Sequence, residues 1–199
     1  MKKILAAGLF ISLVSFTACT TTNRLSSVSA NEAKGIITGW PAKTQEVANT
    51  IMVKYGAPNE ITGTMLVWHN NGPWKRTIIH KEPVQHNFPM PHLDLLEQFV
   101  NYSVPADKFD ELAQYDGSVV VARTVGEMSA RCDKEEANFL AINLANDVAT
   151  GKKTVDDARA YYARAIKEMM EGKMDPYLQK IQFSPQANTK FEDKAAPGM

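Results

Sequence analysis

Cysteine is scarce in this chain, which has only Cys19 and Cys132 among its 199 residues. A framework of several disulfides, on which many small secreted domains rely, is therefore excluded. The chain also lacks net charge, because 22 lysines and arginines balance 22 aspartates and glutamates. A chain without an excess of positive charge lacks the basic surface that binds a polyanion, so we expect no nucleic-acid partner.

Several common functional motifs are also missing. The sequence has no phosphate loop of the form GxxxxGK[ST], no GxGxxG, no GxSxG and no CxxC. Their absence argues against the usual nucleotide-binding enzymes and simple hydrolases. The sequence also lacks an apolar run of about 20 residues, the length that a membrane-spanning helix needs.

The first 18 residues have the pattern of a secretory leader. Two lysines at positions 2–3 precede an apolar stretch over residues 4–16, which has the length of a signal-peptide core. This stretch ends in Phe16-Thr17-Ala18-Cys19, which resembles the lipobox of bacterial lipoproteins, with Phe16 in place of the usual leucine.

The resemblance implies that residues 1–18 are a lipoprotein signal peptide. In that family the cysteine, here Cys19, takes a diacylglycerol, the leader is cut before it, and the new amine is acylated with palmitate. Several acyl chains hold a protein stably on a membrane. Because Thr20 rather than aspartate follows the cysteine, the resemblance implies the outer membrane, with the protein facing the periplasm. An ordinary secretory leader with a chance cysteine is the alternative.

Lipidation of Cys19 would leave Cys132 as the only thiol of the mature chain. The alternation of Met128, Ala130 and Cys132 places this thiol on the apolar side of a predicted strand. Acidic residues directly after it oppose the formation of a thiolate. We therefore expect a buried, slowly reacting thiol, and a reactive catalytic thiol at Cys132 is the alternative.

The distribution of apolar residues predicts one domain with two extensions. Residues 19–35 are rich in Thr, Ser and Asn and predict a flexible tether, and residues 184–199 predict a disordered tail. Between them, residues 36–183 carry alternating and helical apolar patterns. In chain order these patterns predict a helix over 44–55, strands over 61–68 and 74–79 and an irregular loop over 82–92. Residues 95–104 predict a strand, or a short helix that leads into one. A helix over 105–115, a strand over 118–128, two helices capped by Asp133 and Thr154, and a short helix over 176–183 follow.

This order of elements lacks the regular strand–helix–strand alternation of a parallel sheet. It predicts an α+β fold, with a mostly antiparallel sheet, helices packed on one face of that sheet and a helical C-terminal part. Residues 44–80 resemble the helix–strand–strand unit of small outer-membrane lipoproteins of the BamE/SmpA type, through Gly56, Pro58, Trp68 and the hairpin. The longer helical C-terminal half departs from that family.

Three of the four histidines, His80, His86 and His92, lie in or beside the predicted loop, with Glu82 and Asp94 nearby in the sequence. Imidazole is a common ligand of transition metals, so these three residues are candidate metal ligands. Their spacing matches no compact metal motif, and surface histidines on a polar loop are the alternative. The sequence does not indicate any other cofactor.

Aromatic and basic residues flank the turn of the predicted hairpin. Trp68, Trp74, Lys75 and Arg76 form a candidate interaction surface, because exposed aromatics beside cations are typical of binding hot spots. The alternative is that both tryptophans pack on the sheet.

Two functions from different classes follow from these observations. The first is a non-enzymatic binding or assembly module, held on the membrane by Cys19 and presenting its domain to an envelope protein partner. The second is a metal-binding or small catalytic protein that uses the loop histidines or Cys132.

Overall fold

The computed structural model describes residues 28–184, 186–191 and 193–199. The predicted signal peptide over 1–18, Cys19 and the first part of the predicted tether lie outside these residues. Within the described ranges, none of the helices is both long enough and apolar enough to span a membrane.

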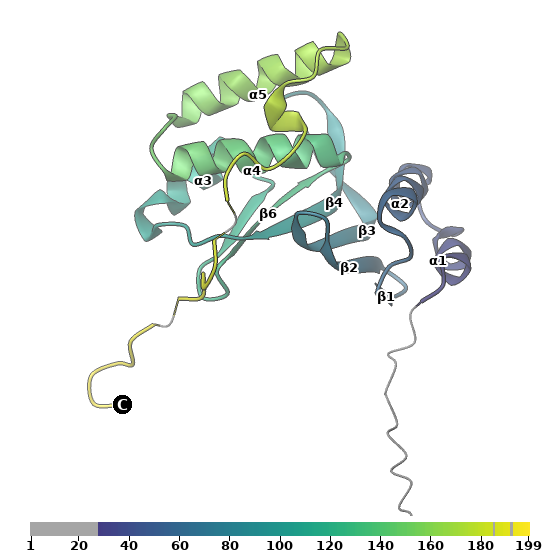
Figure 1. The fold of residues 1–199 in the computed structure, drawn as a ribbon, viewed down its shortest axis with the longest axis horizontal. Coiled ribbons are helices and arrows are strands. Elements are labelled where there is room, and N and C mark those ends of the chain that lie inside the picture. Colours follow the sequence, from purple (N-terminus) through teal and green to yellow (C-terminus); the bar gives the residue numbers. More distant parts are fainter. Residues whose placement is uncertain (1–27, 185, 192) are drawn as a thin grey trace, which may run out of the picture.

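A six-stranded antiparallel sheet forms the centre of the fold (Figure 1). Its strands lie side by side in the order β1-β2-β3-β4-β6-β5, and every neighbouring pair is antiparallel. The strands are β1 (Glu60–Ile61), β2 (Met65–Asn71), β3 (Trp74–His86), β4 (His92–Asn101), β5 (Val119–Ala122) and β6 (Glu127–Cys132).

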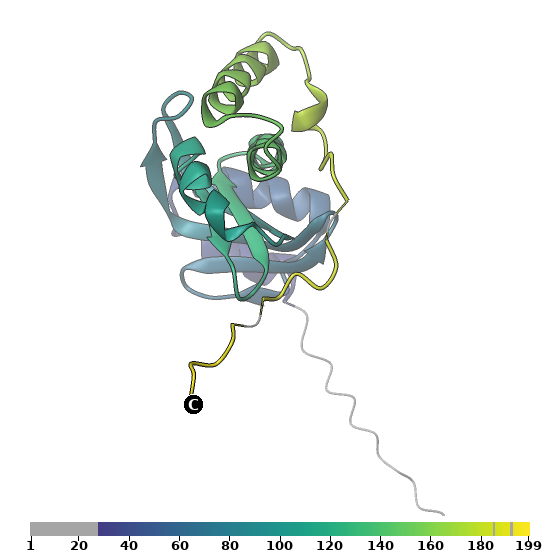
Figure 2. The same ribbon diagram turned by 90° about the vertical axis from the view of Figure 1, so that its left-hand side faces the viewer.

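Helices cover one face of this sheet, and α5 lies outside α4 as a further layer (Figures 1 and 2). The helices are α1 (Ala30–Ile37), α2 (Ala42–Tyr55), α3 (Phe109–Tyr115), α4 (Glu135–Ala149) and α5 (Val155–Met170), with short 3-10 helices η1 (Ala106–Lys108) and η2 (Pro176–Leu178). The predicted α+β class, with an antiparallel sheet and a helical C-terminal part, is confirmed.

Helix α4 is buried on almost every side because it lies between the sheet and α5. Leu140 and Leu144 are fully buried and belong to one cluster with Met128 of β6 and Ala158 of α5. A helix that is apolar on most sides is stable only in such a position, as its sequence predicts.

A second apolar cluster joins α2 to the other end of the same sheet face. Ile51 of α2 belongs to one cluster with Leu66, Ile79 and Leu96. These three residues are paired across β2, β3 and β4, and Cys132 of β6 pairs with Leu96. Because paired residues share a face, α2 and α4 pack on the same side of the sheet.

Strand β3 is longer than its prolines predict. The irregular loop predicted over 82–92 is wrong for most of its length, because β3 continues to His86 and only residues 87–91 connect it to β4. Pro83 is tolerated because the pairing of β3 with β4 is irregular between Ile79 and Val84, so its missing N–H breaks no regular ladder.

The strand predicted over 118–128 is two strands, β5 and β6, joined by a tight turn. Gly126 in this turn has a φ of +69°, and a Cβ there would lie 2.0 Å from the carbonyl oxygen of Thr189. Only glycine avoids both the strained backbone and the clash. The C-terminal segment can therefore pack against this turn only because residue 126 is glycine.

Both predicted extensions contain ordered contacts. The tether predicted up to residue 35 is wrong from Ala30 onward, because Ser29 and Glu32 form a capping box that begins α1. In the predicted tail, Thr189 is buried and the Phe191 amide donates to the Thr124 carbonyl over 3.3 Å.

Helix caps give one correct and one incorrect prediction. Thr154 caps α5 by accepting from the Asp157 amide, as predicted. Asp133 does not cap α4, whose N-cap position is Lys134. The Asp133 carboxylate lies 3.4 Å from Lys43 instead.

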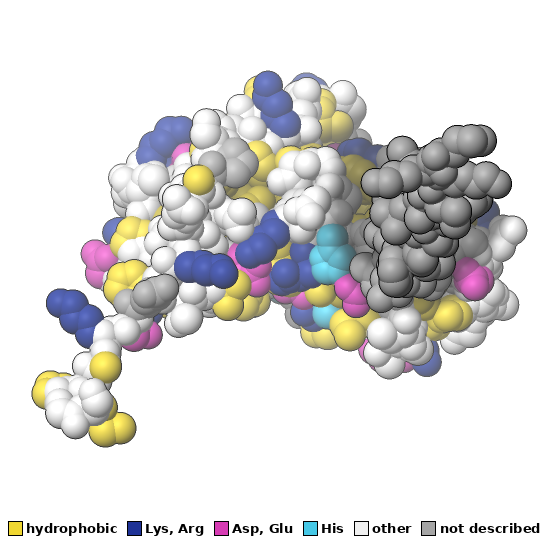
Figure 3. Space-filling model, turned by 60° about the horizontal axis from the view of Figure 1, so that its bottom comes forward, with side chains coloured by type: hydrophobic (Ala, Val, Ile, Leu, Met, Phe, Trp, Pro, Cys, Tyr) yellow, Lys and Arg dark blue, Asp and Glu magenta, His cyan; other side chains and the backbone are white. Residues whose placement is uncertain are grey.

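The molecular surface carries both signs of charge. On the face in Figure 3, basic and acidic side chains are interspersed rather than gathered into a patch of one sign. This distribution fits the balanced composition of the chain.

Candidate metal centre

The hairpin formed by β3 and β4 brings two of the predicted histidines together. His86 ends β3 and His92 begins β4, and the two residues are paired across the hairpin. Asp94 lies two residues further along β4, so its side chain points to the same face as His92. Ligand atoms of these three residues all lie within 4.8 Å of one another.

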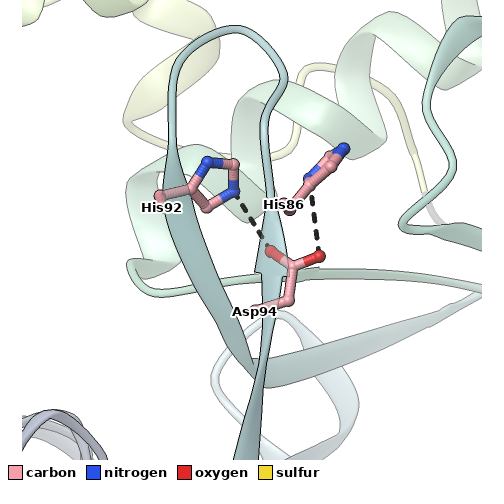
Figure 4. Close-up of side chains that lie close together, drawn as sticks. All are labelled: His86, His92 and Asp94. Atoms are coloured by element: carbon pink, nitrogen blue, oxygen red, sulfur yellow. Dashed lines mark ion pairs between the residues drawn. The ribbon is translucent and has the colours of Figure 1, made fainter.

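Both imidazole rings point towards the Asp94 carboxylate (Figure 4). His92 Nε2 lies 3.1 Å from Asp94 Oδ1, and His86 Nδ1 lies 3.4 Å from Asp94 Oδ2. Ligands bound at about 2.0–2.1 Å to a tetrahedral ion are roughly 3.3 Å apart. The distance from each histidine to the Asp94 carboxylate is therefore that of neighbouring ligands of one ion.

Hydrogen bonding assigns the roles of the two nitrogens of His92. Its Nδ1 lies 2.8 Å from the carbonyl oxygen of Met90, which can only accept a hydrogen bond. Nδ1 therefore carries a hydrogen and donates it, so Nε2 is the nitrogen available to a metal. A backbone carbonyl that orients a histidine in this way is typical of metal ligands.

The Asp94 carboxylate is buried and incompletely satisfied. Its Oδ2 accepts from the Ser118 hydroxyl, whose oxygen lies 3.2 Å from His86 Nδ1. Its Oδ1 is buried and has no hydrogen-bond donor of good geometry. A buried carboxylate oxygen without a donor is costly, and either a bound cation or a proton on His92 would compensate it.

Asp116 adds a second buried carboxylate beside the histidines. Its Oδ1 accepts from the Ser118 amide over 2.9 Å and lies 3.8 Å from His86 Nε2. Burial raises the pKa of Asp116, although the imidazole of His86 opposes this shift. Ser118 and Asp116 lie just before β5, so they approach the hairpin from a distant part of the chain.

The carboxylate of Asp94 strongly affects His92. Its negative charge, 3.1 Å from Nε2, is the main reason that the pKa of His92 is raised, to about 11, with a further contribution from Cys132. In the metal-free chain His92 is therefore protonated at neutral pH. A metal ion must displace this proton, and it would then take over the charge compensation of Asp94.

His80 does not belong to this centre, so its prediction as a metal ligand is wrong. Between the pairs Ile79–Leu96 and Val84–Asp94, β3 advances five residues and β4 only two. β3 therefore contains three more residues than β4 in this interval. Because side chains alternate between the faces of a sheet, an odd number of extra residues reverses the face to which the later residues of β3 point. His80 consequently lies on the opposite face of the sheet, where its Nε2 is 2.8 Å from Glu97.

Three residues at or beside the centre, Asp94, Asp116 and Ser118, are not among the ligands predicted from the sequence. For Asp94 the signal is the strand pattern His-x-Asp over 92–94, which places the side chains of His92 and Asp94 on one face. Asp116 and Ser118 carry no local signal, because only the folded chain brings them to the hairpin.

The structure corrects the prediction of an interaction surface, because both of its tryptophans are buried. Trp68 donates to the Gly56 carbonyl over 3.0 Å, and Trp74 donates to Glu135 over 2.6 Å. Lys75 and Arg76 pair with Glu127 at 2.9 and 3.0 Å. The tryptophans pack on the sheet because an indole that is buried with a satisfied N–H stabilises the core.

Cys132 is buried, as predicted, with 5% of its surface exposed. Burial raises the pKa of its thiol, and the neighbouring His92 only partly opposes this shift. The structure thus brings together the cysteine and one histidine that the sequence singled out separately. The neutral thiol is the favoured form, which does not suit a nucleophile.

Cys132 should react slowly with thiol reagents in the folded protein. In a chain with Cys19 replaced by serine, one thiol remains, and its labelling can be followed by absorbance with a disulfide reagent. We expect labelling to be orders of magnitude slower in buffer than in denaturant, because the thiol is buried and neutral. Fast labelling of the native protein at pH 6 would contradict this, since it requires an open site and a lowered pKa.

A comparison of the chain with protein-family models, curated proteins and solved structures finds no match. The local likeness of residues 44–80 to BamE/SmpA-type lipoproteins therefore stays a prediction.

Proposed function

We propose that this protein binds a divalent transition-metal ion through His86, His92 and Asp94. The observation that carries the proposal is the pair formed by His92 Nε2 and Asp94 Oδ1, 3.1 Å apart. With Nδ1 of His92 engaged by the Met90 carbonyl, Nε2 is the nitrogen that can bind a cation once its proton leaves, and Asp94 Oδ1 is an acceptor beside it.

The donor set supports a particular class of metal. Two imidazoles and one carboxylate suit zinc and iron(II), whereas calcium and magnesium prefer oxygen ligands alone. Three protein ligands also leave a coordination position open, as in catalytic rather than purely structural sites. The Met90 carbonyl, which accepts from His92, and the Ser118 hydroxyl, which donates to Asp94, supply the outer contacts that orient such ligands.

Titration of chelator-treated protein with zinc in a calorimeter tests the proposal. We expect one site of micromolar or tighter affinity, and a higher melting temperature when zinc is bound. His92→Ala and His86→Ala should each lose this binding, whereas His69→Ala should keep it. His69 is a matched control, because it is a half-exposed histidine paired with Glu60 and lies outside the centre. No binding by the wild type, or equal binding by all variants, would refute the proposal.

We further propose that the metal is bound at the bacterial envelope. The support is the leader over residues 1–18 and the lipobox-like segment that ends in Cys19. An envelope protein meets transition metals directly, so such a location suits a metal-binding module. An envelope protein partner stays a prediction. The surface expected to bind this partner contains two buried tryptophans, which are not available for contact.

Replacement of Cys19 with alanine should release the protein from the membrane. Without the thiol there is no site for the lipid, so the variant should be found in the soluble periplasmic fraction or as an uncut precursor. Fractionation and mass spectrometry of the wild type provide the comparison. A mature wild-type protein with an unacylated residue 19 would contradict the anchor.

A further inference from the structure

A cavity of about 460 Å³ lies directly beside the metal centre. It is lined by Tyr162, Ile166 and Met169 of α5 and by Met90 in the β3–β4 connection. His92 and Cys132 also line it, so the cavity and the metal centre share His92. Its volume lies in the range of about 300–1,000 Å³ that is usual for small-molecule sites.

The walls of the cavity are apolar and adaptable. Methionine is unbranched and polarisable, so it fits ligands of varied shape. Met90 and Met170 line the cavity and are 43% and 67% exposed, so the apolar surface continues to the rim. Such walls suit a flexible hydrocarbon rather than a sugar or a nucleotide, whose many polar groups would be left without partners.

Three charged side chains that line the cavity lie together near the start of α4. Lys43 and Lys134 lie 3.4 and 3.5 Å from Asp133, so two ammonium groups share this carboxylate. Lys43 also pairs with Glu46, which does not line the cavity. Two lysine ammonium groups and a single carboxylate therefore line the cavity, which favours an anionic ligand group.

We propose that this cavity binds an amphipathic carboxylate, with its hydrocarbon chain between α5 and the β3–β4 connection and its carboxylate near Lys43 and Lys134. The proposal goes beyond metal binding and does not depend on it, because the two lysines supply positive charge when no metal is present.

Calorimetry with decanoate and with decanol, a neutral probe of equal chain length, tests both parts of the proposal. Chelator-treated protein is used first, so that failure of the metal site does not affect the result. We expect decanoate to bind, and decanol to bind several-fold more weakly. Lys134→Gln should weaken decanoate binding about 1.4- to 5-fold and leave decanol unchanged, since an exposed ion pair contributes about 0.2–1 kcal/mol.

A variant that fills the cavity tests its location. Ala137 of α4 is buried in the cavity wall, and Ala137→Phe should remove decanoate binding. Val53→Phe is the matched control, because Val53 is 89% exposed and does not line the cavity. Protection of Cys132 gives a measurement on the wild type, since bound decanoate should slow its labelling further.

Three results would overturn the proposal. Failure of decanoate to bind would remove the ligand class, and equal binding of decanol would remove the role of the lysines. Binding without any protection of Cys132 would place the ligand elsewhere. Loss of zinc binding with decanoate binding intact would refute the metal centre alone.

Discussion

Replacement of Asp94 with asparagine should abolish tight zinc binding while keeping the shape of the side chain. Loss of an outer-shell partner costs roughly 10–100-fold in metal affinity, and loss of a charged ligand should cost more. Competition with a chromophoric chelator measures the change. Wild-type affinity in Asp94→Asn would mean that any bound zinc lies elsewhere.

The same centre predicts a pH dependence with a definite sign. The pKa of His92 is raised to about 11 in the metal-free chain, so a proton competes with zinc and the affinity should rise with pH above neutrality. For the metal-free protein, the stability that His92 contributes is complete below its unfolded pKa of about 6.5. This contribution is then lost as the pH rises through about 11. Zinc affinity that is flat between pH 6 and 8 would contradict the role of His92.

Replacement of Leu144 with alanine should lower the free energy of unfolding by about 2–5 kcal/mol. The side chain is fully buried in the middle of α4, between the sheet and α5, so its removal leaves a cavity that cannot collapse easily. Leu140→Ala should behave similarly for the same reason.

Urea denaturation followed by circular dichroism measures both effects. Val53→Ala provides the control, because a side chain that is 89% exposed should change the stability by less than about 0.5 kcal/mol. Midpoints unchanged by both leucine substitutions would show that α4 is not the central helix of the core.

Much of the fold was predictable because its signals are local. The apolar stripe of α4, the Thr154 cap of α5 and the hairpin of β2 and β3 each follow from a few neighbouring residues. Helical and alternating patterns depend on such short-range spacing. The α+β class then follows from the order in which these elements occur.

The irregular pairing of β3 was not predictable in the same way. The prolines near residue 83 indicate that the pairing of β3 is interrupted, but they do not predict how many residues the interruption contains. That number decides which face His80 and His86 occupy, since a surplus of three residues reverses the face. The sequence therefore identified the histidines but not which of them share a site.

The remaining parts of the centre depend on contacts across the chain. Asp116 and Ser118 reach His86 through the tertiary arrangement of the sheet, in which β5 pairs with β6 and β6 with β4. Similarly, Trp74 is buried because Phe139 of α4 stacks on it at 4.8 Å between ring centroids. Neither contact has a signal in the residues next to these side chains.

X-ray absorption at the zinc edge is the most direct test of the proposed centre. The protein should be loaded with one equivalent of zinc, and the first coordination shell should contain two imidazole nitrogens and carboxylate oxygen at about 2.0–2.2 Å, without sulfur. A shell with sulfur at about 2.3 Å would assign the metal to a cysteine instead. A shell without imidazole scattering, or a protein that retains no zinc, would contradict the account.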